Sequence, residues 1–82
     1  MKVQVKVFPI TGLCNQSQKL ELALGNGNFS EVLTLLAEKL GVSFDKFEKL
    51  MFLHNGRGLD RKKDVVLCDG DELWLLPQIT GG

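Results

Sequence analysis

The chain opens with a strict alternation of apolar and polar residues. Val3, Val5 and Val7 are separated by single polar residues, and this period of two is typical of a strand with one buried face. Residues 19–24 alternate in the same way, with leucine at every second position, and a polar stretch at residues 11–18 separates the two segments. Because strands adjacent in sequence usually pair, the pattern predicts an antiparallel pair joined by a long loop.

Residues 29–40 have the spacing of an amphipathic helix. Apolar residues recur every three or four positions from Phe29 to Leu40, which would form one continuous apolar stripe. Asn28 and Glu31 have the form of a capping box, in which each side chain accepts a hydrogen bond from a backbone N–H of the first turn. Gly41 follows where a left-handed residue ends a helix at little cost. The pattern therefore predicts a helix that begins after Asn28 and ends at Gly41.

The second half of the chain contains shorter elements. Residues 42–49 are compatible with a short helical turn, and the apolar run at residues 50–53 predicts a third strand. Asn55-Gly56 is a strong hairpin signal that leads to a short fourth strand at residues 57–59. A turn at residues 69–71 precedes a fifth strand at residues 72–76, which ends at Pro77. One amphipathic helix and one sheet with a matching apolar face predict a two-layer α+β domain.

Length, composition and charge narrow the class of protein. The 82 residues suffice for one small domain, and 44% hydrophobic with 24% charged residues is an ordinary globular composition. Ten basic residues cancel ten acidic ones, so no overall charge attracts the chain to nucleic acid or to an anionic membrane. The first residues lead directly into strand alternation rather than a signal-peptide core. We therefore expect a cytoplasmic protein with neither nucleic acid nor a membrane as partner.

Residues that could support catalysis or metal binding are sparse. Cys14 and Cys68 lie far apart without a CxxC motif, so they are expected to be buried or incidental thiols, and no metal site is expected. No nucleophile has a paired base, no glycine-rich phosphate loop is present, and His54 is the only histidine. Asp69 and Asp71 flank Gly70 and indicate a turn rather than a catalytic pair. We expect that the chain does not catalyse a reaction alone.

A basic run at residues 61–63 follows the fourth strand. It is interpreted as a solvated loop, with a docking patch for an acidic partner as the alternative.

The last six residues, Pro77-Gln78-Ile79-Thr80-Gly81-Gly82, follow the fifth strand and end in two glycines. One interpretation is a frayed terminus. The other is a reactive arm, since six extended residues reach roughly 20 Å, and glycines without Cβ fit a narrow channel and leave the α-carboxylate accessible. Pro77 would fix the backbone at the root of this arm. A carboxylate reacts with nucleophiles only after activation, so adenylation by another protein is the expected chemistry. We expect a domain at residues 1–76 and a flexible tail at residues 77–82.

Several of these segments together resemble a known family. The Asp-Gly-Asp-Glu-Leu turn at residues 69–73, Pro77, the final Ile-Thr-Gly-Gly and the helix start at residues 28–33 are similar to those of the MoaD/ThiS sulfur-carrier proteins. The likeness extends over essentially the whole chain and is nearest to MoaD, the small subunit of molybdopterin synthase. It implies a ubiquitin-like β-grasp fold, in which a mixed sheet of four to five strands packs on one main helix in the order ββαββ(β).

The resemblance also implies a chemistry for the tail. The carboxylate of Gly82, next to Gly81, would be adenylated by an activating enzyme of the MoeB/ThiF type that uses ATP and magnesium, and then converted to a thiocarboxylate by a persulfide donor. The chain itself would bind no cofactor. In the molybdenum branch the tail would enter a large synthase subunit of the MoaE type and give its sulfur to a pterin precursor. Pro77, Ile79 and Thr80 are the other tail residues expected to contact a partner.

Other functions remain compatible with the same residues. Related carriers serve thiamine thiazole or cysteine synthesis, some are conjugated to lysines as ubiquitin-like modifiers, and a ubiquitin-like interaction domain could have a tail without a chemical role. Gln78 stands where the molybdopterin branch usually has a second proline.

The outer face of the sheet is a second candidate site. If Leu73 and Leu75 face the helix, then Trp74 and Leu76 point the other way. They would lie beside Phe52, or beside Met51 and Leu53, according to a register that the pattern does not fix. Exposed large apolar side chains often mark an interface, so Trp74, Leu76 and Phe52 are predicted to bind a partner. The alternative is that the loop after the first strand covers Trp74.

Overall fold

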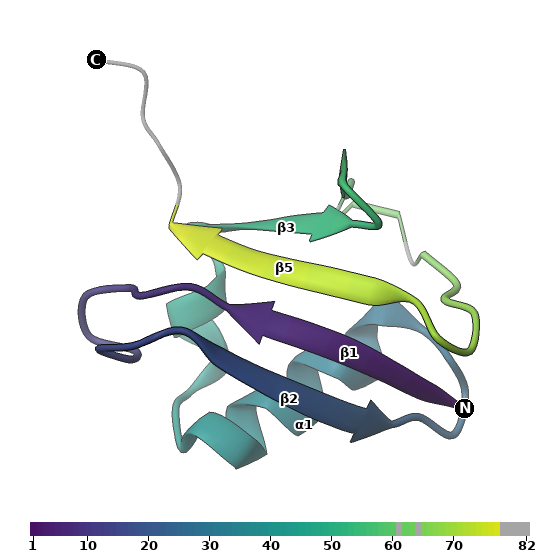
Figure 1. The fold of residues 1–82 in the computed structure, drawn as a ribbon, viewed down its shortest axis with the longest axis horizontal. Helices are drawn as coiled ribbons and strands as arrows, with labels where there is room; N and C mark the ends of the chain where they lie inside the picture. The colour runs from purple at the N-terminus through teal and green to yellow at the C-terminus, as the bar shows by residue number, and fades with distance from the viewer. Residues whose placement is uncertain (61, 64, 78–82) are drawn as a thin grey trace.

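The computed structural model of the chain describes residues 1–60, 62–63 and 65–77 (Figure 1). The elements in chain order are β1 (Lys2–Val7), β2 (Gln18–Ala23), α1 (Phe29–Leu40), the short 3₁₀ helix η1 (Phe44–Phe47), β3 (Leu50–His54), β4 (Arg57–Gly58) and β5 (Glu72–Pro77). This is the predicted order, with strand boundaries that differ by one residue at several ends and a short helix that begins two residues later and ends two residues earlier than the predicted segment. In the described part of the chain, no helix is both long and apolar enough to cross a membrane.

The five strands form one mixed sheet in the order β2-β1-β5-β3-β4. β1 pairs antiparallel with β2, as the alternation predicts, and parallel with β5. β3 pairs antiparallel with β5 and with β4. The helix α1 lies against one face of this sheet (Figure 1), so the predicted two-layer α+β architecture is confirmed. β5, the last strand of the described residues, occupies the centre of the sheet.

The core lies between α1 and the sheet. The alternating residues of β1 and β5 that were expected to face the helix are fully buried: Val3, Val5, Val7, Leu73 and Leu75. They meet Phe29, Val32 and Leu36 from α1. Burial of a large apolar side chain contributes about 1.5–3 kcal/mol, so these residues form the main stabilising contact between the two layers.

The pairing of β3 with β5 settles which residues share the outer face. Met51 stands opposite Leu76, Leu53 opposite Trp74, and Phe52 opposite Leu75. Because neighbouring residues of a strand point to opposite faces, Phe52 lies in the core, where it is 1% exposed. Its ring packs edge-to-face on Phe29 at a centroid distance of 4.8 Å. The prediction that Phe52 lies on the partner-binding face is therefore wrong, and Met51 takes that place.

The start of α1 differs in detail from the predicted capping box. The Asn28 side chain makes no capping hydrogen bond. The Glu31 carboxylate instead reaches back beyond the cap and accepts hydrogen bonds from the backbone N–H groups of Gly25, Asn26 and Gly27. These donors stabilise the charged form, and they lower the pKa of Glu31 with the Gly25 bond as the largest cause. At the other end, Gly41 adopts the predicted left-handed conformation with φ 68°.

Two further features complete the fold. Asn55 and Gly56 both have positive φ, at 50° and 86°, which is the geometry of the predicted tight hairpin between β3 and β4. The second feature is a short backbone pairing between residues 65–67 and residues 27–29, which the sequence pattern did not predict. Leu67 N–H donates to Gly27 O, and Phe29 N–H donates to Val65 O. This pairing holds the buried Leu67 beside the start of α1.

Candidate partner-binding site

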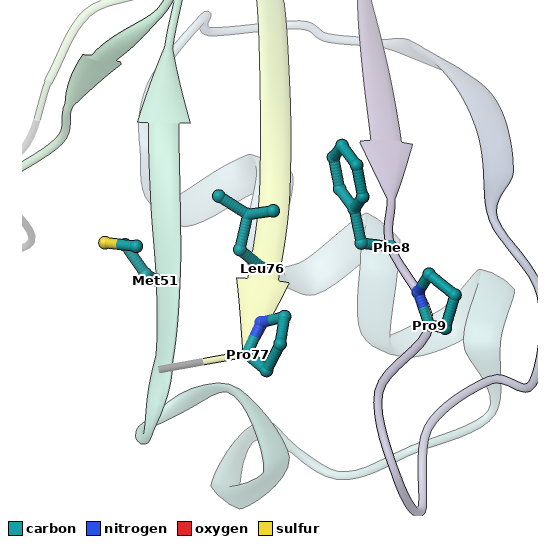
Figure 2. Close-up of a pocket in the computed structure, with 5 residues that line it drawn as sticks. All are labelled: Phe8, Pro9, Met51, Leu76 and Pro77. Carbon is teal, nitrogen blue, oxygen red and sulfur yellow. The ribbon is translucent and has the colours of Figure 1, made fainter. Parts of the chain in front are cut away.

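An apolar groove lies at the carboxyl end of β5, on the face of the sheet opposite α1 (Figure 2). Its volume is about 390 Å³, and it is lined by Phe8, Pro9, Met51, Leu76 and Pro77. The topology explains why these residues meet. Because β1 and β5 are parallel, both strands end at the same edge of the sheet. The antiparallel register of β3 then places Met51 beside Leu76.

A backbone hydrogen bond holds the two groove residues that follow β1, Phe8 and Pro9, beside β5. Phe8 N–H donates to Leu75 O at 3.0 Å, which extends the contact between β1 and β5 beyond the last residue of β1. Pro9 follows and offers no N–H to continue the ladder. The ring of Phe8 and the ring of Pro9 therefore stand at the edge where β5 ends.

Trp74 extends this apolar surface along β5. Its side chain is half-buried, and its ring lies 5.3 Å from that of Phe8 in a tilted arrangement. Its indole N–H donates to the carboxylate of Glu72. Phe8, where the loop after β1 begins, thus packs against one side of the ring. Trp74 lies on the face away from α1, as the alternation predicts.

Lys6 lies over both aromatic rings. Its Nζ atom is 4.9 Å from the centroid of Phe8 and 5.6 Å from that of Trp74. A cation at this distance is attracted by the negative face of an aromatic ring. The apolar surface therefore has a positive charge at its border.

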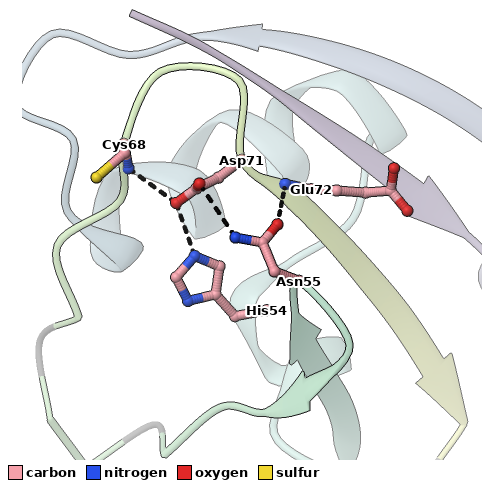
Figure 3. Close-up of polar contacts among 5 residues, drawn as sticks. All are labelled: His54, Asn55, Cys68, Asp71 and Glu72. Carbon is pink, nitrogen blue, oxygen red and sulfur yellow. Dashed lines mark hydrogen bonds and ion pairs between the residues drawn. The ribbon is translucent and has the colours of Figure 1, made fainter.

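A polar cluster lies at the other end of β5 (Figure 3). One carboxylate oxygen of Asp71 is 2.7 Å from His54 Nε2 and also accepts the N–H of Cys68. The other accepts a hydrogen bond from Asn55 Nδ2. The Cys68 N–H, followed by the His54 bond, lowers the pKa of Asp71. The cluster ties the β3–β4 hairpin to the turn before β5, in agreement with the interpretation of residues 69–71 as a turn.

Neither cysteine thiol lines the groove or bonds to Asp71. Cys14 is half-buried, and its thiol donates to Phe8 O at 3.4 Å. Cys68 is exposed, so it is an incidental surface thiol rather than a buried one. Within the described residues, no three histidine, cysteine, aspartate or glutamate side chains form a group that could hold a metal ion.

The structure brings together only part of the predicted site. Leu76 and Pro77 line the groove, and Trp74 adjoins it through Phe8. The predicted tail residues Ile79, Thr80, Gly81 and Gly82 lie outside the described residues. Of the basic run at residues 61–63, the described Lys62 and Lys63 are exposed.

Two groove residues, Phe8 and Pro9, were missed by the sequence analysis as members of a site, and Met51 was named only as one of two alternative neighbours of Trp74 and Leu76. Phe8 and Pro9 directly follow the alternating residues of the first strand in the sequence. Their place in the groove depends on the parallel pairing of the first and last strands, for which local sequence contains no signal.

Comparison with known proteins gives likeness in structure alone. No protein-family model matches the chain, and no curated protein matches it in sequence. Small archaeal modifier protein 1 from Haloferax volcanii is 17% identical over 100% of both chains, with a TM-score of 0.73. A chain in the complex of subunits 1 and 2 of molybdopterin-converting factor from Helicobacter pylori is 24% identical over 100% of both chains, with a TM-score of 0.67.

A third solved structure is similar over nearly the whole length. Small archaeal modifier protein 1 from Methanosarcina acetivorans is 20% identical over 99% of this chain and 96% of its own, with a TM-score of 0.68. Together with the sheet order and the packing of α1 on one face, these matches confirm the expected ubiquitin-like β-grasp fold.

Proposed function

We propose that this protein is a sulfur carrier whose reactive group is the α-carboxylate of Gly82. The observation that supports this most directly is the combination of a β-grasp fold with a sequence that ends in Thr80-Gly81-Gly82 after β5. The likeness to a chain of a molybdopterin-converting factor complex favours the molybdopterin route. In this proposal the folded domain presents the tail and does not catalyse the reaction by itself.

The chemistry takes place in two steps on the terminal carboxylate. First, a carboxylate oxygen attacks the α-phosphorus of ATP, held with magnesium by an activating enzyme of the MoeB/ThiF type, and pyrophosphate leaves. Next, a sulfur nucleophile attacks the acyl carbon and AMP leaves. Sulfide gives the thiocarboxylate directly. With a persulfide donor, a thiol must then reduce the acyl disulfide, and that thiol is oxidised to a disulfide.

The proposed role of the groove and Trp74 is to dock the proteins that use the tail. The groove borders Pro77, which is the last residue of β5 and the first residue of the expected tail. A protein bound there would also meet the residues that follow. The proposed partners are the activating enzyme and a sulfur acceptor, for which a large synthase subunit of the MoaE type is the first candidate. Apolar docking with a few aromatic anchors is typical of protein interfaces.

A second candidate function is conjugation to lysine as a protein modifier. It is favoured by the likeness to two proteins described as small archaeal modifier protein 1. The first step is the same adenylation, but the ε-amine of a lysine, rather than sulfur, finally displaces the activated group and forms an isopeptide bond.

Intact-mass spectrometry tests these functions. The 82-residue chain is incubated with an activating enzyme of the MoeB/ThiF type, ATP, magnesium and sodium sulfide, and a chain without Gly81 and Gly82 serves as the matched control. A sulfur carrier is expected to gain the mass of one sulfur-for-oxygen exchange only in the intact chain. Replacement of sulfide by a lysine-rich acceptor protein tests the modifier, for which a ladder of conjugates is expected. An unchanged mass in both reactions would contradict both functions.

A further inference from the structure

Charged residues are distributed unevenly over the outer face of the sheet. Near the start of β1, Lys2 Nζ lies 3.4 Å from the carboxylate of Glu21. Near its end, Lys6 stands directly opposite Lys19 in the β1–β2 register. Among the described residues, neither of these two lysines forms an ion pair with a carboxylate. Lys6 and Lys19 are therefore two positive charges on the outer face near the groove, and the one carboxylate of β5, that of Glu72, accepts the Trp74 indole N–H.

Lys6 and Lys19 place two like charges at opposite positions of neighbouring strands. Like charges directly opposite each other on neighbouring strands destabilise a sheet. The ring contacts of Lys6 with Phe8 and Trp74 hold its ammonium group on the same side as the groove. A carboxylate from another molecule would neutralise the pair without any rearrangement of the sheet. The two lysine ammonium groups and the apolar groove thus form one continuous surface with a basic part and an apolar part.

We propose that Lys6, Lys19 and the groove together bind a protein segment in which a large apolar side chain is followed by carboxylates. The apolar side chain would enter the groove between Phe8 and Leu76, and the carboxylates would lie over the two ammonium groups. Charge complementarity selects this occupant over a purely apolar or a basic one. The inference rests on the proposed function only in that the segment would belong to a protein that uses the tail. The binding itself needs no chemistry at Gly82.

A peptide titration followed by NMR tests the surface directly. The probe is acetyl-Leu-Phe-Gly-Asp-Asp-amide, added to the ¹⁵N-labelled 82-residue chain, and the matched probe has two lysines in place of the aspartates. The acidic probe is expected to shift the amide signals of Lys6, Phe8, Met51 and Leu76. Its affinity should fall as salt increases, because the charges are exposed and screened. The basic probe should bind at least about threefold more weakly.

Charge-reversal variants separate the two lysines from the rest of the surface. Lys6→Glu and Lys19→Glu are each expected to lower the affinity for the acidic probe by about 3- to 10-fold, because the attraction between lysine and aspartate becomes a repulsion between two carboxylates. Lys19→Glu also places opposite charges across β1 and β2, so it should not lower the melting temperature. Lys39→Glu, on the exposed side of α1, is the matched control and should leave the affinity unchanged.

Several results would overturn the inference. These are equal affinity for the acidic and basic probes, full affinity in Lys19→Glu, shifts confined to α1, or no shift at millimolar probe. The mass assay for the tail is independent of this titration. Sulfur uptake without peptide binding would overturn the docking surface alone, whereas peptide binding without any change in mass would contradict the proposed function alone.

Discussion

The side chain of Asp71 joins the β3–β4 hairpin to the turn from which β5 begins. Its carboxylate accepts the Cys68 N–H and an Asn55 amide N–H and also pairs with His54. In addition, Asn55 Oδ1 accepts the N–H of Glu72. Sequence spacing identified the turn but not this cluster, because His54 and Asp71 are 17 positions apart. A hairpin and a turn that are remote in the chain are held together by one side chain.

Replacement of Asp71 by asparagine should lower the free energy of unfolding at neutral pH. It should also make that free energy less dependent on pH in the acidic range. Loss of bonds to a charged, mostly buried acceptor costs about 1–3 kcal/mol. The pKa of Asp71 is lowered in the folded state. Its contribution is therefore complete above the unfolded pKa of about 3.9 and is lost as the pH falls through the lower folded value. Urea unfolding of both proteins at a series of pH values measures the difference.

The control for Asp71→Asn is Glu38→Gln, which removes a carboxylate from the exposed side of α1. It should change stability by less than about 0.5 kcal/mol at every pH. A stability difference between Asp71→Asn and the parent that is equally large below the folded pKa of Asp71 would contradict the role assigned to its charge.

Trp74→Ala should affect binding more than folding. The ring is half-buried and packs on Phe8, and such an aromatic pair contributes about 0.5–1.5 kcal/mol. At an interface an aromatic anchor typically contributes about 2 kcal/mol or more, so association with the proposed activating enzyme should weaken by about tenfold or more. Calorimetry of binding and a thermal melt give the two numbers. A large fall in melting temperature with unchanged affinity would show that Trp74 is only a packing residue.

At the scale of the elements, alternation in the sequence was sufficient to assign the strands but not their register. The period-two pattern correctly identified the buried valines of β1 and the buried leucines of β5. The apolar run at residues 50–53 has no alternation, so both of its faces were equally apolar in sequence. Only the pairing with β5 shows that Phe52 faces inward and Met51 outward.

Substitution of Phe52 should therefore mainly reduce folding stability, whereas substitution of the adjacent Met51 should mainly reduce partner binding. Phe52→Ala removes a ring that contacts Phe29 and Phe47 in the core and should cost about 3–5 kcal/mol of folding stability. Met51→Ala, at a residue that is 38% exposed, should cost less than about 1 kcal/mol and should weaken partner binding. Chemical denaturation and the binding assay used for Trp74 measure both effects. Equal destabilisation by the two changes would contradict the register.

At the scale of the whole molecule, the fold class could be predicted and the groove could not. One helical stripe and one sheet face determine two layers, whatever the order of the strands. The groove exists because β1 and β5 are parallel neighbours and end together, although they lie at opposite ends of the sequence. Local patterns contain no information on such a pairing.

Deletion of Gly81 and Gly82 should leave folding stability nearly unchanged while it abolishes the proposed reaction of the terminal carboxylate. Folding stability should change by less than about 0.5 kcal/mol, because both residues follow the last strand. The proposed adenylation and sulfur transfer should end, since the new terminus is a threonine whose carboxylate is two residues short. Thermal melting and the mass assay measure the two properties. Sulfur transfer by the shortened chain would contradict the proposed role of Gly82.

The central position of β5 also has a mechanical consequence. A partner that pulls on the tail applies force along a strand that is hydrogen-bonded to β1 on one side and to β3 on the other. Under such a load the bonds of both ladders are sheared together instead of being opened one at a time, as they would be in a peripheral strand peeled from its end. β5 therefore resists a force applied at its carboxyl end better than a peripheral strand would.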